Sequence, residues 1–193
     1  PQHAFVTIEE ELAKQQSVSY PLVMKVVSPQ ILHKSDEGGV ILNIASSGAA
    51  LESFRNMQEK FKNRGFQGVM LYEQVPEAME MIAGIYRDPD FGPVVAVGAG
   101  GIYTEIVKDI SLRIAPFRRQ TAEEMIGELK TAPLLRGYRG QKPLAVGAFV
   151  ELIESLSRIA IRYPEIRELD LNPVFITENR VLVGDTRILT DRQ

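Results

Sequence analysis

The sequence contains no cysteine and no tryptophan, and its only histidines are His3 and His33. The lack of cysteine excludes a disulfide framework, a thiolate metal site and a cysteine nucleophile. Two histidines are too few for an ordinary histidine-based zinc site. No apolar run approaches the roughly 18 residues of a membrane span, and no secretion signal opens the chain. We therefore expect no membrane association.

Charge of neither sign dominates. Lysine and arginine number 22, aspartate and glutamate 25, and the net charge is −3, which argues against a nucleic-acid partner. The 193 residues are 45% hydrophobic and 24% charged, as is usual in globular proteins. This length suits one large domain or two small ones. We expect a soluble, cytoplasmic protein.

Apolar periodicity predicts both strands and helices. Thr121 and Glu124 have the spacing of a capping box, which predicts that a helix starts there. Strands and helices alternate without βαβ regularity, so we expect an α+β fold with two lobes that meet near residues 73–77. The predicted strands are 20–27, 40–44, 68–74, 80–86, 94–97, 107–115, 170–177 and 181–188, and the predicted helices are 51–61, 121–129 and 146–163.

Several familiar sites are absent from the sequence. No glycine is followed by lysine, which excludes a P-loop, and the glycines at 98, 100 and 101 do not continue into a dinucleotide fingerprint. There is no GxSxG nucleophile elbow either. A nucleotide-binding or acyl-transfer site in this chain would therefore need an arrangement of residues other than these three motifs.

Lys25 interrupts an otherwise apolar strand. Lysine is common on edge strands, where it faces solvent and blunts aggregation. A lysine on a buried strand can instead meet a phosphate as a point charge. Residues 33–39, HKSDEGG, follow as a loop whose paired glycines, Gly38 and Gly39, let backbone N–H groups approach an anion or simply let the chain turn. Both alternatives remain open at each place.

The last two predicted strands suit a hairpin. A turn at Glu178–Asn179 would make Asn172 face Asp185 and Asp170 face Arg187. We expect the face that carries Asp170 and Asn172 to be apolar near the turn and polar at its open end. An amide oxygen opposite a carboxylate, about 5 Å apart at Cβ, suits Mg²⁺, although a polar strand end reaching solvent would look the same. The apolar pairs expected on that face are Val174 with Val183 and Ile176 with Val181.

Four ordered motifs carry a resemblance to a known family. They are Tyr20–Lys25 (YPLVMK), His33–Val40 (HKSDEGGV), Asp88–Pro93 (DPDFGP) followed by the GAGG of residues 98–101, and Leu169–Pro173 (LDLNP) followed by Val183–Arg187 (VGDTR). With these motifs the chain resembles the ATP-grasp domain of the ADP-forming acyl-CoA synthetases, relatives of succinyl-CoA synthetase. The resemblance covers nearly the whole chain and implies an ATP-grasp fold that binds nucleotide between its lobes.

The resemblance also implies lobes over residues 1–72, incomplete at its start, and 73–193. It implies a role for each matching residue. Lys25 and the Gly38–Gly39 loop would meet the nucleotide phosphates, and His33 would be the phosphohistidine. Asp170 would orient a phosphohistidine brought in by a partner. Of the remaining residues, Glu73, Gln74 and Val75 would form the hinge at adenine, Glu80 would hold the ribose hydroxyls, and Asn172 and Asp185 would bind Mg²⁺.

The function implied is part of a reversible reaction, acyl-CoA with ADP and phosphate giving free acid, ATP and CoA. ATP or ADP and Mg²⁺ would be the cofactors, and the CoA-binding domains or an alpha subunit the partner. Two alternatives are the ATP-grasp module of a protein lysine acetyltransferase, which needs neither His33 nor Asn172, and a carboxylate–amine ligase, which makes acyl phosphate without a histidine.

Overall fold

The computed structural model describes residues 1–31, 34, 37–75, 78–101 and 108–191. Contacts between Cα atoms divide the chain into two compact units, Pro1–Pro76 and Glu77–Gln193. Each unit has its own antiparallel sheet and its own hydrophobic core, which confirms the predicted mixture of helices and strands. Within the described part of the chain, no helix combines the length and apolar character that a membrane crossing needs.

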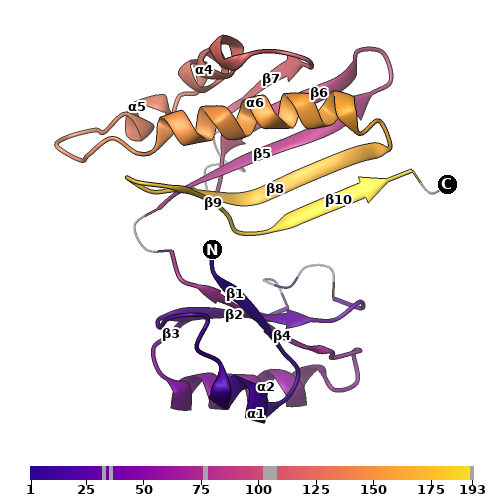
Figure 1. Ribbon diagram of the computed structural model, residues 1–193, viewed down its shortest axis with the longest axis vertical. Helices are drawn as coiled ribbons and strands as arrows, with labels where there is room; N and C mark the ends of the chain where they lie inside the picture. Colours follow the sequence, from indigo (N-terminus) through magenta and orange to yellow (C-terminus); the bar gives the residue numbers. More distant parts are fainter. Residues whose placement is uncertain (32–33, 35–36, 76–77, 102–107, 192–193) are drawn as a thin grey trace. The chain divides into compact units, whose positions relative to one another are not determined.

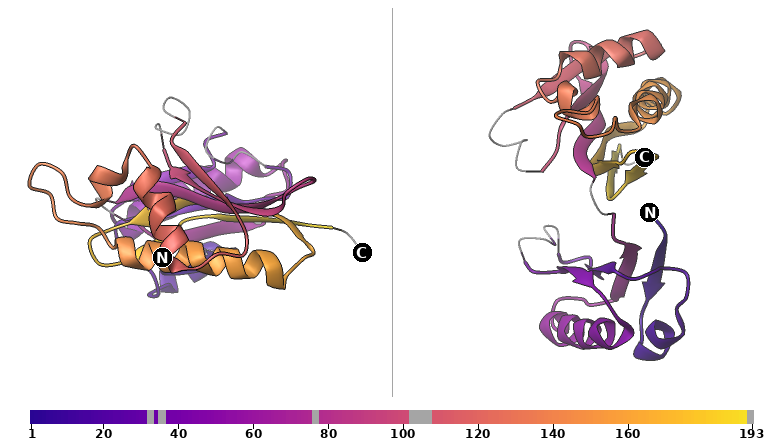
Figure 2. Two further views of the ribbon diagram at one scale, coloured as in Figure 1. Left: turned by 90° about the horizontal axis from the view of Figure 1, so that it is seen from above. Right: turned by 90° about the vertical axis from the view of Figure 1, so that its left-hand side faces the viewer.

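The first unit is a four-stranded sheet with two helices packed on one face (Figure 1, Figure 2). The strand order is β1-β4-β2-β3, so β2 and β4 are central. The elements are β1 (His3–Val6), α1 (Glu9–Lys14), β2 (Leu22–Val27), β3 (Val40–Ile44), α2 (Ser47–Phe61) and β4 (Gly68–Glu73).

Helix α2 supplies most of the cover of this sheet. The Ser46 hydroxyl accepts a hydrogen bond from the Ala49 N–H at 3.3 Å, which caps the start of the helix. Phe54, Met57 and Phe61 are buried along one face, as their spacing predicted. Three such side chains, each contributing about 1.5–3 kcal/mol on burial, hold the helix on the sheet.

The second unit is a six-stranded sheet in the order β10-β8-β5-β6-β7, with β9 also paired to β8. Helices cover one of its faces (Figure 2), and their buried residues share one core with β5, β6 and β8. The strands are β5 (Met79–Asp88), β6 (Gly92–Ala99), β7 (Ile110–Ile114), β8 (Ile166–Ile176), β9 (Val181–Val183) and β10 (Thr186–Thr190), and the helices are α4 (Arg119–Glu128), α5 (Ala132–Leu135) and α6 (Val146–Arg162).

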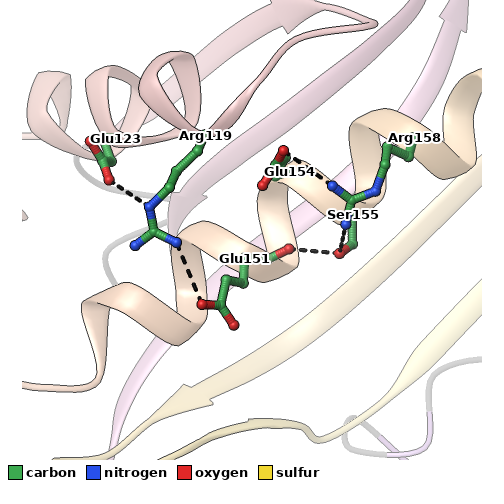
Figure 3. Close-up of polar contacts among 6 residues, drawn as sticks. All are labelled: Arg119, Glu123, Glu151, Glu154, Ser155 and Arg158. Carbon is green, nitrogen blue, oxygen red and sulfur yellow. Dashed lines mark hydrogen bonds and ion pairs between the residues drawn. The ribbon is translucent and has the colours of Figure 1, made fainter.

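Helix α4 begins at Arg119, before the predicted capping box. The prediction of a start at Thr121 was therefore wrong, because the N-cap is Arg118 and makes no side-chain cap hydrogen bond. Figure 3 shows Arg119 paired with Glu123 one turn on and with Glu151 of α6. These exposed ion pairs contribute little, so the buried apolar face of α4 determines its position.

Arg87 of β5 caps the end of α6. Its guanidinium donates to the carbonyl oxygens of Ala160 at 2.8 Å, Tyr163 at 3.0 Å and Ile166 at 2.7 Å. The last carbonyls of a helix have no partner within the helix, and a cation there also complements the helix dipole. Arg87 thus ties the end of α6 to the β5–β6 hairpin.

Candidate functional site

Lys25 lies on a strand that is paired on both sides. Its Cα partners are Met70 of β4 and Val40 of β3. The edge-strand explanation is therefore wrong. Neighbouring Met24 and Val26 are fully buried in the core shared with the helices, so alternation puts Lys25 on the face of the sheet opposite those helices. Pairing on both sides thus fixes the backbone at Lys25, whose side chain is half-buried.

The glycine pair lies in a turn tied to helix α2. Gly38 has a φ of 66°, and its carbonyl accepts from the Lys60 ammonium at 3.5 Å. The Gly39 N–H donates to the Lys34 carbonyl at 2.6 Å, and a Cβ on Gly39 would lie 2.5 Å from a methyl carbon of Val26. Gly39 is thus required for a close approach to β2. The predicted phosphohistidine, His33, lies outside the described residues.

The predicted hinge starts at the end of β4. The Gln74 N–H donates to the Pro21 carbonyl at 3.2 Å. The Gln74 side chain accepts from the Asn43 N–H at 2.7 Å and donates to the Asn43 side-chain oxygen at 2.5 Å. These bonds fix Gln74 between two strand ends, with Glu73 as the last residue of β4 and Val75 directly after it.

The C-terminal strands pair in the predicted register. Val174 faces Val183, and Asp170 faces Arg187. Between these pairs the Asn172 N–H donates to the Asp185 carbonyl at 3.2 Å. The proposed magnesium ligands are therefore cross-strand neighbours, as the sequence indicated.

The prediction that one face carries both the polar and the apolar pairs was wrong. Strand β8 contains a bulge, because Leu171 pairs with Ala83 while Val174 pairs with Met81. Two residues of β8, Asn172 and Pro173, thus oppose a single residue of β5. The extra residue reverses the alternation. Asp170 and Asn172 lie on the face away from the core, while the buried side chains are Leu169 and Leu171 before the bulge and Val174 and Ile176 after it.

Negative charge gathers beside the Asn172–Asp185 pair. Burial raises the pKa of Asp170, the carboxylates of Glu168 and Asp185 raise it further, and Arg187 opposes them. Among the described residues there is no group of three or more acidic or histidine side chains around one point. Mg²⁺ commonly takes only one or two protein oxygens and completes its shell with water and phosphate. Asn172 and Asp185 fit such an ion.

Glu80 contacts the glycines that follow β6. The Gly100 N–H donates to the Glu80 carbonyl at 2.8 Å. A Cβ on Gly100 would lie 2.9 Å from that carbonyl oxygen, and one on Gly101, whose φ is 59°, would lie 3.2 Å from a Glu80 carboxylate oxygen. Only glycine allows this approach. The GAGG motif thus positions Glu80, a link that sequence reasoning did not make.

The DPDFGP motif has a structural explanation. The Asp88 carboxylate accepts from the N–H groups of Asp90 at 2.9 Å and Phe91 at 3.0 Å, and so closes the β5–β6 turn. The motif therefore shapes a hairpin, and the hairpin carries Glu80 and Gly100 at its far ends.

Comparison with known proteins identifies the family. The ATP-grasp domain family matches residues 1–189. The chain belongs to the ATP-grasp family. It is 42% identical to the beta subunit of ADP-forming acetate–CoA ligase I of Pyrococcus furiosus, over 98% of this chain and 84% of that subunit. It is 41% identical to ADP-forming acetate–CoA ligase I of Archaeoglobus fulgidus, over 90% of this chain and 26% of that protein.

A solved structure shows the same fold. It is acetyl-coenzyme A synthetase 1 of Ca. Korarchaeum cryptofilum with coenzyme A and Mg-AMPPCP, its phosphohistidine segment pointing towards the nucleotide-binding site. Its TM-score is 0.86 at 37% identity, over 99% of this chain and 85% of that chain. The resemblance to ADP-forming acyl-CoA synthetases is confirmed. The chain spans most of a separate beta subunit and about a quarter of a fused enzyme.

Proposed function

We propose that this chain is the nucleotide-binding, phosphoryl-transferring part of an ADP-forming acyl-CoA synthetase, which converts acyl-CoA, ADP and phosphate to free acid, ATP and CoA. The observation that carries the proposal is the Asn172–Asp185 pair, placed in register across a hairpin with Asp170 alongside. In the first unit, a cation, Lys25, lies on a strand that is paired on both sides.

Each residue has a defined task in this function. Lys25 neutralises charge on the nucleotide phosphates, Glu80 accepts hydrogen bonds from the ribose hydroxyls, and Asn172 and Asp185 hold Mg²⁺. When bound, Mg²⁺ supplies charge neutralisation at the phosphate oxygens. A protein catalyses phosphoryl transfer mainly by positioning the reactants and by stabilising charge electrostatically. Asp170 orients a phosphohistidine brought by the CoA-binding domains or alpha subunit.

The relatives reported above are acid–CoA ligases, which favours this function over the two alternatives. A lysine acetyltransferase module would have no task for Asn172. A carboxylate–amine ligase makes acyl phosphate without a histidine, so His33→Ala would leave its turnover intact.

Mg-ADP is expected to bind this chain and raise its melting temperature. At a hundredfold excess over the dissociation constant, linkage gives about 2.7 kcal/mol of stabilisation. Asp185→Asn removes one proposed magnesium ligand, so it should weaken binding with Mg²⁺ present and change little in EDTA. Asp90→Asn, in the exposed β5–β6 turn, is the matched control. Equal loss of affinity with and without Mg²⁺ would refute the assignment of Asp185 as a ligand.

Gly100→Ala is expected to weaken Mg-ADP binding by roughly tenfold, in line with the cost of overpacking a tight contact. The new methyl group would meet the Glu80 carbonyl oxygen at 2.9 Å and push Glu80 away. Gly48→Ala is the control, because a Cβ there meets nothing within 4 Å. Affinity is measured by isothermal titration calorimetry on protein whose circular dichroism is unchanged. Unaltered affinity would show that the glycine has no link to ligand binding.

A further inference from the structure

Three strands bring an aromatic ring beside the Lys25 ammonium. Tyr72 of β4 pairs with His3 of β1 on one side and with Val23 of β2 on the other. Lys25 lies two residues beyond Val23, so it is the diagonal neighbour of Tyr72 on the same face. Its Nζ atom lies over the Tyr72 ring at 5.0 Å from the centroid. The His3 and Tyr72 ring centroids are 6.0 Å apart.

The place of the ring follows from the backbone. β4 is bonded to strands on both sides, and the preceding residue, Leu71, is fully buried against the helices. Tyr72 therefore lies on the opposite face of the sheet. It also directly precedes Glu73, where the predicted adenine hinge starts. Tyr72 thus lies between the lysine and the hinge along the sheet.

A ring in this position restrains a lysine without neutralising it. A lysine side chain loses rotamer freedom when one geometry is imposed on it. The negative face of an aromatic ring attracts an ammonium group within about 6 Å. Contact with the ring leaves the charge of the ammonium itself unchanged. An anion arriving at Lys25 then meets a cation that is already partly ordered.

We propose that Tyr72 is a positioning residue, which holds the Lys25 ammonium over its ring ready for the phosphates of the nucleotide. This inference rests on the proposed function. It requires the π face of the ring and assigns no task to the Tyr72 hydroxyl. It also requires that the effect of Tyr72 pass through Lys25, so both requirements are testable.

The test compares Tyr72→Leu, which removes the ring, with Tyr72→Phe, which keeps it. Tyr72→Leu is expected to weaken Mg-ADP binding about two- to thirtyfold, the range that corresponds to a cation–π contact. Tyr72→Phe should restore wild-type affinity. Phe5→Leu is the control, since Phe5 is an exposed aromatic that pairs with Met70 on the same sheet. Its affinity should match that of the unmodified protein.

A double-mutant cycle separates positioning from general packing. In the Lys25→Met background, Tyr72→Leu should have no further effect on Mg-ADP affinity. A purely structural role would weaken binding equally with and without Lys25, and that result would overturn the inference. Equal affinity of Tyr72→Leu and the unmodified protein would overturn it too, while leaving the proposed function standing. If the unmodified protein bound no Mg-ADP, the proposed function would fall, and the inference with it.

Discussion

Replacing His33 with alanine is expected to abolish phosphoryl transfer through this chain and to lower overall turnover of the intact enzyme by at least about a thousandfold. Removal of a covalent nucleophile has effects of this size or larger. A neutral imidazole suits the task because its unperturbed pKa, about 6.5, leaves a nucleophilic nitrogen free near pH 7. The imidazole nitrogen attacks the phosphorus of the phosphoryl donor as the bond between that phosphorus and the donor's leaving group breaks. A terminal phosphate oxygen of ADP then attacks the same phosphorus, which breaks the N–P bond, forms ATP and frees the imidazole.

The measurement follows a phosphate label. The intact enzyme, which includes the CoA-binding domains or alpha subunit, is incubated with γ-labelled ATP and Mg²⁺, and an acid-labile, base-stable label should form on His33. His3→Ala is the control, because His3 is the only other histidine of the chain and its loss should leave the label in place. Full turnover by His33→Ala would contradict the carrier role and favour a ligase that needs no histidine.

Asp109→Ala is expected to destabilise the second unit by about 3–5 kcal/mol, the largest stability effect that we predict. Asp109 is only 4% exposed. Its carboxylate accepts from the Lys130 N–H at 2.7 Å, the Thr131 N–H at 2.9 Å and the Thr131 hydroxyl at 2.7 Å. Hydrogen bonds to charged groups contribute about 1.5–3 kcal/mol each, and alanine would leave buried donors unsatisfied.

Urea denaturation followed by circular dichroism measures this loss. Asp90→Ala, in an exposed turn, is the matched control and should change stability by less than about 0.5 kcal/mol. A similar midpoint for both variants would contradict the importance of the Asp109 contacts.

The same carboxylate predicts a pH dependence. Burial alone would raise the pKa of Asp109, but the Thr131 hydroxyl, the two backbone N–H groups and the Lys130 charge hold it below its ordinary value. A folded pKa below the unfolded value, about 3.9, stabilises the protein above that pH. This stabilisation is lost as the pH falls through the folded pKa. Stability should therefore decline below about pH 4, and less steeply in Asp109→Ala.

Local pattern was enough for much of the fold. The apolar spacing of Phe54, Met57 and Phe61 predicted the buried face of α2, because helix periodicity depends only on neighbours in sequence. The register around Asn172 and Asp185 was predictable too, since a tight turn sets the pairing of the two strands that it joins.

Other features depended on strands distant in sequence. Whether Lys25 faces solvent on an edge or is held at the centre depends on β4, which starts more than 40 residues later and pairs with β2. Pro173 within a strand was the signal for a bulge, but only the pairing of β8 with β5 shows where the alternation reverses. The hydrogen bond from Gly100 to Glu80 likewise joins residues at the two open ends of the β5–β6 hairpin, which are distant in sequence.

The sequence by itself determined the family, the mixed helix and strand content and the candidate residues, because motifs and periodicity are local properties of the chain. Only the tertiary structure decided on which face of its sheet each candidate residue lies and which neighbouring side chain restrains it. Tyr72 beside Lys25 is the clearest case. Its place follows from a cross-strand register that no stretch of neighbouring residues encodes, because strand pairing is a contact between segments far apart in the chain.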